Sequence, residues 1–261
     1  MSLFNKRIVI CRRREQAREL VKALQQRKAW PVVFPTFEVN LLPPQMDVLD
    51  ELGDLSRFAW LVFGSENGVR FFRHWLEQMQ WPAIRERRVA MVGKKTAAAW
   101  NKLFPNIPVS LQENYLQAVL DKLAAFAGAQ KIPVLNPTSL QSLEKVQLQV
   151  PQEIDLWRLP VYSTNRCETN APEEIDFVRS GQYDTVYFGS PTSFEFFLDI
   201  VGAEPLKGHV AIAVSGKTTA AFIAEKGFKV DILPASPNQE DLLAAMEQYF
   251  EEQVIEGKER T

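Results

Sequence analysis

The chain repeats one strand–turn–helix pattern. Residues 60–72 read WLVFGSENGVRFF and residues 185–197 read TVYFGSPTSFEFF, so an apolar segment, Phe-Gly-Ser and a Phe-Phe pair recur at matching positions. VGKKTAAAW from Val92 likewise matches SGKTTAAFI from Ser215, and FPTFEV from Phe34 matches LPVYST from Leu159. Aligning Phe63 with Phe188, Gly93 with Gly216 and Pro35 with Pro160 gives offsets of 125, 123 and 125 residues. Three matches in one order at nearly one spacing indicate a duplicated set of βα units.

Each copy alternates strands with helices. Residues 7–11 (RIVIC) form an apolar run typical of a parallel strand covered on both faces, and further strands are predicted at 32–34, 58–63, 89–92, 132–135, 184–188 and 210–214. Amphipathic helices are predicted from apolar stripes at Ala17, Leu20, Val21 and Leu24, at Leu116, Val119, Leu120 and Leu123, and at Leu242, Met246, Tyr249 and Phe250. This alternation predicts right-handed βαβ crossovers and parallel sheets. We expect the tail from residue 251 to be frayed or disordered.

Two proline-rich or polar segments, 35–45 and 160–172, are predicted to be non-helical, irregular links. They occupy equivalent positions in the repeat, so the chain is expected to leave one domain and return to it. This division gives a discontinuous domain of residues 1–35 plus 167–261, a second domain of residues 38–160, and connectors at 35–39 and 160–166. A tandem division near residue 128 is the alternative.

Composition excludes several classes of protein. The 261 residues carry a net charge of −2, which argues against nucleic-acid binding. The N-terminal apolar run is too short for a signal peptide, and no segment approaches the roughly 18 apolar residues that span a bilayer. Two cysteines are too few for a disulfide framework; we expect Cys11 in the core and Cys167 without a special role. We therefore expect a cytoplasmic protein without membrane or nucleic-acid partners.

The turns that follow four predicted strands are the candidate binding segments. In an open parallel sheet, ligands bind beyond the carboxyl ends of the strands, near helix N-termini. Glycine, hydroxyl and lysine groups there suit an anionic ligand, although helix capping alone explains any single motif. The turn residues are Ser65, Glu66 and Asn67; Gly93, Lys94, Lys95 and Thr96; Ser190, Pro191 and Thr192; and Ser215, Gly216, Lys217, Thr218 and Thr219.

Other chemistries are poorly supported by the motifs. A phosphate-binding P-loop needs a glycine five residues before Gly93 or Gly216, where Arg88 and Ala211 stand. The two histidines form no metal-ligand spacing, no cysteine cluster is present, and a G-x-S-x-G elbow is missing, so we predict no metal site and no Ser/His/Asp triad. His74 is expected on the surface of a helix.

Arg12–Arg14 and Tyr162 are further candidates. Positive charge is unfavourable at a helix N-terminus, so the arginines are either a solvated helix start or are compensated by a group such as a ligand carboxylate. Tyr162 lies in the second connector, where its repeat partner is Phe37. A phenol can donate a hydrogen bond or a proton at neutral pH, so this side chain either assists a departing hydroxyl or packs at a hinge.

Together these motifs resemble the uroporphyrinogen-III synthase family over nearly the whole chain. ICRRREQARELVKAL is similar to the family's strand–Thr-Arg-Pro–helix opening, with Cys11 and Arg13 in place of threonine and proline. VFGSENGVRFF resembles its Phe-Thr-Ser-x-Asn-Gly-Val segment with Gly64 replacing threonine, FGSPTSFEFF resembles its Ser-Pro segment, and VGKKTAAAW and SGKTTAAFI resemble its Gly-x-x-Thr-Ala elements. VYST matches its Val-Tyr-x-Thr linker. The family's Arg-Gly segment is replaced here by LNPTSLQSL.

The resemblance implies two HemD-like (flavodoxin-like) α/β domains, joined by a two-stranded linker and facing a cleft. It implies a monomeric, cofactor-free hydro-lyase of haem biosynthesis, which cyclises the linear tetrapyrrole hydroxymethylbilane to uroporphyrinogen III with loss of water and inversion of ring D. Tyr162 is then expected to assist hydroxyl departure. The expected substrate-binding residues are Arg12, Ser65, Asn67, Lys94, Thr96, Ser190, Lys217 and Thr219. A non-catalytic binding or sensory module for a carboxylated ligand is the alternative.

Overall fold

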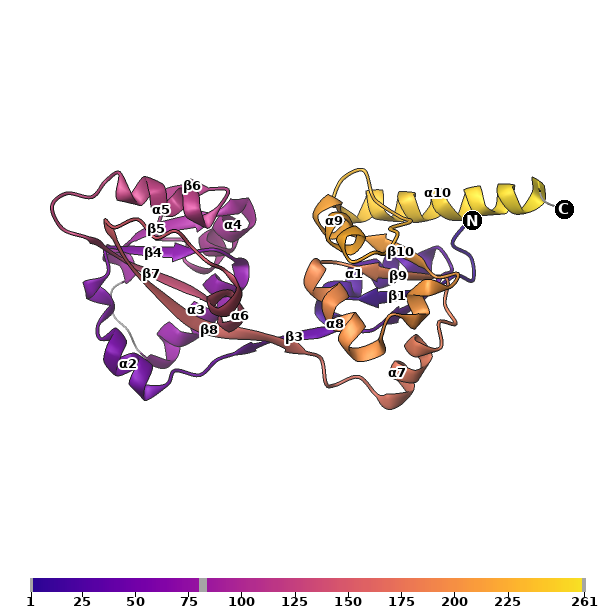
Figure 1. Cartoon of the computed structure of the whole chain (residues 1–261), viewed down its shortest axis with the longest axis horizontal. Helices are drawn as coiled ribbons and strands as arrows, with labels where there is room; N and C mark the ends of the chain where they lie inside the picture. The colour runs from indigo at the N-terminus through magenta and orange to yellow at the C-terminus, as the bar shows by residue number, and fades with distance from the viewer. Residues whose placement is uncertain (1, 80–83, 260–261) are drawn as a thin grey trace. The chain divides into compact units, whose positions relative to one another are not determined.

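The computed structural model describes residues 2–79 and 84–259 (Figure 1). The chain divides into two compact units: unit 1 comprises Met1–Glu38 with Asn165–Thr261, and unit 2 comprises Val39–Thr164. Each unit contains a largely parallel sheet with helices packed against it, which confirms the predicted α/β fold.

Unit 1 contains a four-stranded parallel sheet in the order β10-β9-β1-β2. Its N-terminal strand β1 pairs with both β2 and β9, so the first strand of the chain shares a sheet with strands from the C-terminal third. A tandem division near residue 128 is therefore wrong. The elements are β1 (Arg7–Cys11), α1 (Arg14–Gln26), β2 (Trp30–Val33), α7 (Pro172–Arg179), β9 (Thr185–Phe188), α8 (Pro191–Val201), the 3-10 helix η3 (Glu204–Lys207), β10 (Ala211–Val214), α9 (Lys217–Glu225) and α10 (Gln239–Glu259).

The core of unit 1 has two layers because successive side chains of a strand point to opposite faces. Ile8 and Ile10 of β1 pack with the apolar stripes of α1 and α10, whereas Val9 and Cys11 pack with α7, α8 and α9. All four of these side chains are fully buried. This two-sided burial explains why RIVIC is an unbroken apolar run rather than an alternating one.

Unit 2 contains a six-stranded sheet in the order β3-β8-β7-β4-β5-β6, in which β4–β8 are linked by parallel pairings. β3 and β8 are neighbours, and each crosses the boundary between the units, so the two connections run in these strands. The elements are β3 (Phe37–Leu41), α2 (Met46–Leu52), η1 (Leu55–Arg57), β4 (Trp60–Phe63), α3 (Glu66–Met79), η2 (Ile84–Glu86), β5 (Arg88–Val92), α4 (Gly93–Leu103), β6 (Leu111–Glu113), α5 (Leu116–Ala124), β7 (Ile132–Ser139), α6 (Leu140–Lys145) and β8 (Ile154–Arg166).

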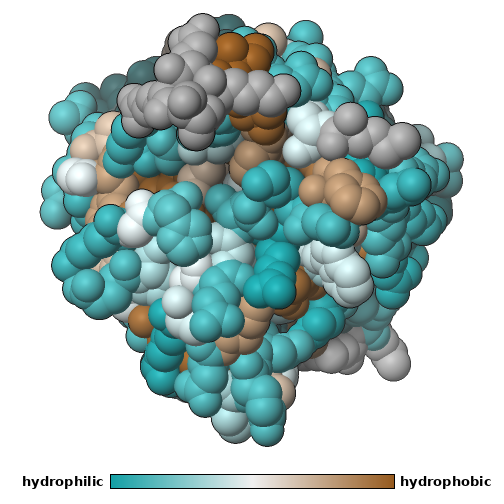
Figure 2. All heavy atoms as spheres, turned by 90° about the vertical axis from the view of Figure 1, so that its right-hand side faces the viewer, coloured by the Kyte–Doolittle hydropathy of each residue, from teal (hydrophilic) through white to brown (hydrophobic). Residues whose placement is uncertain are grey.

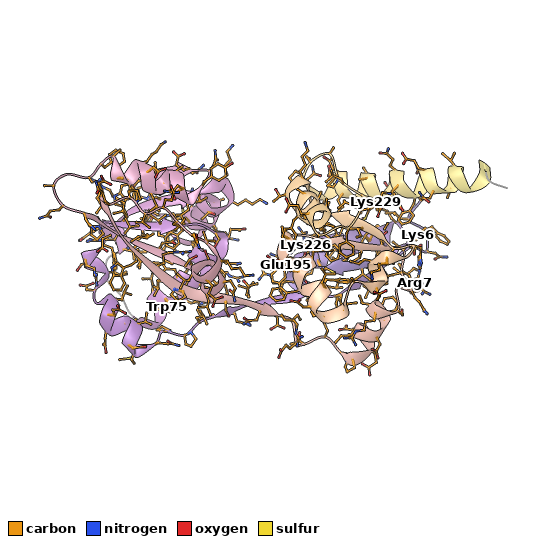
Figure 3. All side chains as sticks on the ribbon, viewed as in Figure 1. Lys6, Arg7, Trp75, Glu195, Lys226 and Lys229 are labelled. Carbon is orange, nitrogen blue, oxygen red and sulfur yellow. The ribbon has the colours of Figure 1, made fainter. Side chains whose placement is uncertain are left out.

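The sheet of unit 2 is also covered on both faces. Leu61 and Phe63 of β4 pack with α3 and α4, where Phe63 lies 5.2 Å from Trp100, centroid to centroid. Trp60 and Val62 face the other way, toward the buried stripe of α5. The tryptophan Trp75 of α3 is buried and donates a hydrogen bond to the carbonyl of Leu42 (2.7 Å), which anchors the segment after β3 (Figure 3).

The strands that precede the candidate turns end where the sequence predicts. β4, β5, β9 and β10 end at Phe63, Val92, Phe188 and Val214. Parallel pairing brings the carboxyl ends of neighbouring strands to one edge of each sheet. In unit 1, Lys6 and Arg7 lie at the opposite, amino end of β1, well away from Glu195 of α8 (Figure 3).

Two expectations are corrected. Residues 160–166 are not an irregular link, because β8 continues through them; Pro160 lies beside a register shift in the β7–β8 ladder, where a missing N–H is tolerated. The tail is helical as far as Glu259, because α10 continues through strong helix formers such as glutamate and glutamine.

The surface is mixed in character. The face turned to the viewer in Figure 2 is mainly hydrophilic, with apolar atoms in small separated groups. His74 is about half exposed, as predicted (54% of its side chain). Within the described part of the chain, no helix combines the length and apolarity that crossing a bilayer requires.

Candidate functional site

Ser65 links the end of β4 to the start of α3. Its Oγ accepts a hydrogen bond from the backbone N–H of Gly68 (3.0 Å), as an N-cap serine does. The same Oγ lies 3.0 Å from the hydroxyl of Tyr162, which is 97 residues away in the chain. Ser65 therefore caps a helix and contacts the phenol at the same time.

Tyr162 is held from several sides. Its ring stacks on Phe71 of α3, with centroids 5.4 Å apart and an interplanar angle of 21°. The residue is 8% exposed. The preceding carbonyl, of Val161, accepts a hydrogen bond from Leu42 N–H (3.1 Å), so the backbone beside the tyrosine is tied to the segment after β3. Stacking on Phe71 and the hydrogen bond with Ser65 hold the phenol in a defined position at the carboxyl edge of the sheet of unit 2.

Gly68 was not singled out from the sequence, although the site depends on it. A Cβ on Gly68 would lie 2.9 Å from the carbonyl oxygen of Pro137 and 3.4 Å from Ser65 Oγ. The first distance is shorter than real Cβ contacts allow, so the close approach of α3 to β7 requires glycine. The signal available in the sequence is Asn-Gly after the serine, where a glycine lies inside a helix despite its low helix propensity.

Asn136 is a second residue that the sequence analysis did not assign to the site. It lies in the LNPTSLQSL segment, near the carboxyl end of β7, and is 1% exposed. Its Nδ2 donates to the carbonyl of Val62 (2.7 Å), next to the last residue of β4. Among the described residues its Oδ1 has no hydrogen-bond partner. Asn136 thus joins the ends of β7 and β4 by a side-chain bond.

The remaining candidates in unit 2 fall into two groups. Lys94 and Lys95, in the first turn of α4, are exposed, and Asn67 at the start of α3 is partly exposed. Thr96 is 4% exposed and packs within the unit. The lysines and Asn67 are accessible to a ligand, whereas the buried hydroxyl of Thr96 is placed to support the turn.

In unit 1 the hydroxyls of Ser190, Ser215 and Thr219 have hydrogen-bond partners within the unit. Ser190 Oγ accepts from Ser193 N–H (3.2 Å), and Ser193 Oγ accepts from Ser190 N–H (3.1 Å), which is a reciprocal cap at the start of α8. Ser215 Oγ donates to the carbonyl of Gly189 (3.0 Å) and lies 3.4 Å from the hydroxyl of Thr219, which is 3% exposed. Lys217, the first residue of α9, is exposed.

The three arginines after β1 have different surroundings. Arg14 begins α1 and pairs with Glu174 (3.3 Å), so a protein carboxylate compensates its charge. Arg12 instead lies over the ring of Tyr187, with 5.3 Å between its guanidinium carbon and the ring centroid. Burial raises the pKa of the Tyr187 hydroxyl, and the charge of Arg12 opposes that shift. Burial also raises the pKa of the Cys11 thiol well above its usual value, so this cysteine is a neutral core residue.

A family model described as uroporphyrinogen-III synthase HemD matches residues 18–244. The chain belongs to this family. The matched residues span both units and include every turn described above except the one after β1.

Individual relatives indicate the same family. A uroporphyrinogen-III synthase from Chlorobaculum parvum is 28% identical over 239 residues, covering 88% of this chain and 93% of the relative. A porphyrin biosynthesis protein HemD from Ruminiclostridium josui is 23% identical over 84% of this chain and 44% of its own length. A crystal structure of a uroporphyrinogen III synthase variant from Thermus thermophilus is similar in fold, with a TM-score of 0.65, 16% identity and coverage of 95% of this chain and 99% of that one.

Within the described residues, no group of three or more histidine, cysteine, aspartate or glutamate side chains is arranged to hold a metal ion.

Proposed function

We propose that the chain is an active uroporphyrinogen-III synthase, a hydro-lyase that closes hydroxymethylbilane to uroporphyrinogen III with loss of water and inversion of ring D. The observation that carries this proposal is the phenol of Tyr162, held by Ser65 and Phe71 at the carboxyl edge of the sheet of unit 2. A hydroxyl leaving group needs a proton, and a positioned phenol supplies one as a general acid.

The proposed first step breaks the bond between the terminal methylene carbon and its hydroxyl. The phenol proton leaves with the hydroxyl as water, and the positive charge that remains is delocalised into the adjacent pyrrole. Attack by the substituted carbon of ring D on the terminal methylene forms a spiro intermediate. The bond from that carbon to its original bridging methylene then breaks, and the released methylene bonds to the free α-carbon of ring D. That carbon loses its proton, which restores the phenol. The balance is one substrate converted to one product and one water.

Ser65 is proposed to make the phenol a better proton donor. Its Oγ already accepts the Gly68 N–H, so its own proton is available to the phenol oxygen, and the phenol proton then points away toward the substrate. As the proton leaves, negative charge develops on the phenol oxygen. The hydrogen bond from Ser65 and the positive N-terminal end of α3 both stabilise that charge.

The eight carboxylates of the proposed substrate require cationic and N–H groups. Lys94, Lys95 and Lys217 are accessible and free to move toward a carboxylate, and Arg12 supplies a more restrained charge. Asn67 and Ser190 add polar groups at helix starts, whereas Ser65 is proposed to act on the phenol rather than on a carboxylate, because its one proton is donated to Tyr162. Thr96 and Thr219 are proposed to support their turns rather than to contact the substrate, because their side chains are buried. We further propose that the protein is a cytoplasmic monomer and needs no cofactor.

The activity is tested with freshly prepared hydroxymethylbilane. We expect the type III isomer to accumulate above the type I product that forms spontaneously, with the two isomers separated chromatographically after oxidation. A product mixture identical to the protein-free reaction would contradict the proposal. It would favour the binding module instead, an alternative that the replacement of Arg-Gly by LNPTSLQSL also supports.

Replacing Ser65 with alanine is expected to lower kcat by about 10- to 100-fold, since a hydrogen bond to a developing charge is worth roughly 1.5–3 kcal/mol. The lost cap costs only about 1 kcal/mol of stability, which thermal unfolding measures separately. In the Tyr162→Phe background the same change should have little further effect on kcat, because the group that Ser65 assists is gone. Equal fold-losses in both backgrounds would show that Ser65 acts independently of the phenol.

A further inference from the structure

Unit 1 contains a small pocket of about 100 Å³ beyond the carboxyl ends of its strands. Arg12 and Tyr187 line one part of it, Ser215 another, and Asn238 and Gln239, at the start of α10, close it. A space of this size accommodates a carboxylate group. Its residues come from distant segments of the chain.

The pocket carries an uncompensated positive charge. Of the described residues that line it, Arg12 is the only charged one. Within the same part of the chain Arg12 forms no ion pair, in contrast to Arg14, which pairs with Glu174. Asp241 lies nearby in the first turn of α10, but its carboxylate accepts a hydrogen bond from Ser236 (2.6 Å) and does not line the pocket. An arginine fork in a small recess suits a carboxylate geometrically as well as electrostatically.

Neighbouring groups hold Arg12 in place and provide further hydrogen-bond donors near it. Gly189 leaves room for the arginine, since a Cβ there would lie 2.8 Å from its Nε. Asn238 caps α10 by accepting from Asp241 N–H (2.8 Å), while the earlier amides of that helix have no intrahelical acceptor. The 21-residue helix α10 thus adds its positive end to the charge of Arg12.

We propose that this pocket binds a single carboxylate, supplied by one acidic side arm of the substrate, with Arg12 as its charge partner. The source of the carboxylate rests on the proposed function; the affinity of the pocket for a carboxylate does not. The pocket then selects for an acidic arm at one position of the tetrapyrrole, because a neutral arm would leave the guanidinium without a partner.

Two measurements test the proposal on the full-length protein. In the first, propionate is titrated against ¹⁵N-labelled protein at constant ionic strength, with propionamide as the uncharged control. We expect saturable shifts of the Ser215, Gly216 and Gln239 amides with propionate alone, and at least about tenfold weaker binding in Arg12→Gln. Absence of saturable shifts, or equal binding by the variant, would overturn the proposal whether or not the protein is a synthase.

In the second measurement, Arg12→Gln is expected to raise KM for hydroxymethylbilane by about tenfold with little change in kcat. Arg14→Gln removes the same charge two residues away and should leave both constants near wild type. Propionate binding without a change in KM would reject the substrate arm as the occupant.

Gly189→Ala provides an independent variant that keeps Arg12. It should weaken propionate binding by displacing the guanidinium, whereas Gly208→Ala, whose Cβ would meet nothing within 4 Å, should not. Equal binding by the two glycine variants would contradict the proposed position of the arginine.

Discussion

Tyr162→Phe is expected to lower kcat for formation of the type III isomer by about 10²- to 10⁴-fold, the usual contribution of a general acid. Phenylalanine keeps the ring that stacks on Phe71, so only the hydroxyl and its contact with Ser65 are lost. KM should change little, because the carboxylates of the substrate bind elsewhere. Initial rates over a range of fresh substrate concentrations give the two constants.

The matched control is Tyr115→Phe, which removes a hydroxyl from a tyrosine that is 74% exposed at the start of α5. It should behave as wild type. Thermal unfolding and circular dichroism should show that Tyr162→Phe is folded. A folded Tyr162→Phe variant with a kcat within about threefold of wild type would rule out proton donation by this phenol.

Gly68→Val is expected to destabilise unit 2 by about 3 kcal/mol. The first added carbon would lie 2.9 Å from the carbonyl oxygen of Pro137, and neither α3 nor β7 can move without disturbing the buried core between them. Overpacking of this kind costs about 1–3 kcal/mol or more, and a β-branched side chain adds two further methyl groups at the point of contact. The change also displaces the N–H that Ser65 accepts, so kcat should fall as well.

Urea unfolding followed by tryptophan fluorescence measures the stability of unit 2, because five of the six tryptophans (all except Trp30) lie within residues 39–164. Gly64→Val is the matched control: Gly64 lies four residues earlier, and a Cβ there would meet nothing within 4 Å. It should unfold near the wild-type urea concentration. Equal shifts of the urea midpoint in Gly68→Val and Gly64→Val would mean that the close approach of α3 to β7 does not require glycine at position 68.

The sequence predicts the fold well because the relevant signals are local or repeated. Apolar runs such as RIVIC, helical stripes such as that at Leu116–Leu123, and the Phe-Gly-Ser turns are each set by a few adjacent residues. Their duplication at nearly constant spacing identifies two copies of one architecture. The same local signals locate the ends of β4, β5, β9 and β10 to the residue.

Errors arose where long-range packing overrides local preference. Polar residues after Pro160 predict an irregular link, yet pairing with β7 extends β8 beyond that proline, and the strand continues to Arg166. Thr96 and Thr219 follow turn glycines, as their accessible neighbours do. The two threonines are nevertheless buried, because their side chains leave the helix toward the interior of the unit.

The amino-acid sequence by itself determined the duplicated α/β architecture, the strand-end turns and the family to which the chain belongs. Only the tertiary structure decided which of those turn residues meet: Ser65 with Tyr162 across 97 residues, Gly68 against Pro137, and Arg12 with the start of α10. The physical reason is that periodicity and turn chemistry act over a few residues, whereas a contact between distant side chains depends on how whole strands and helices pack.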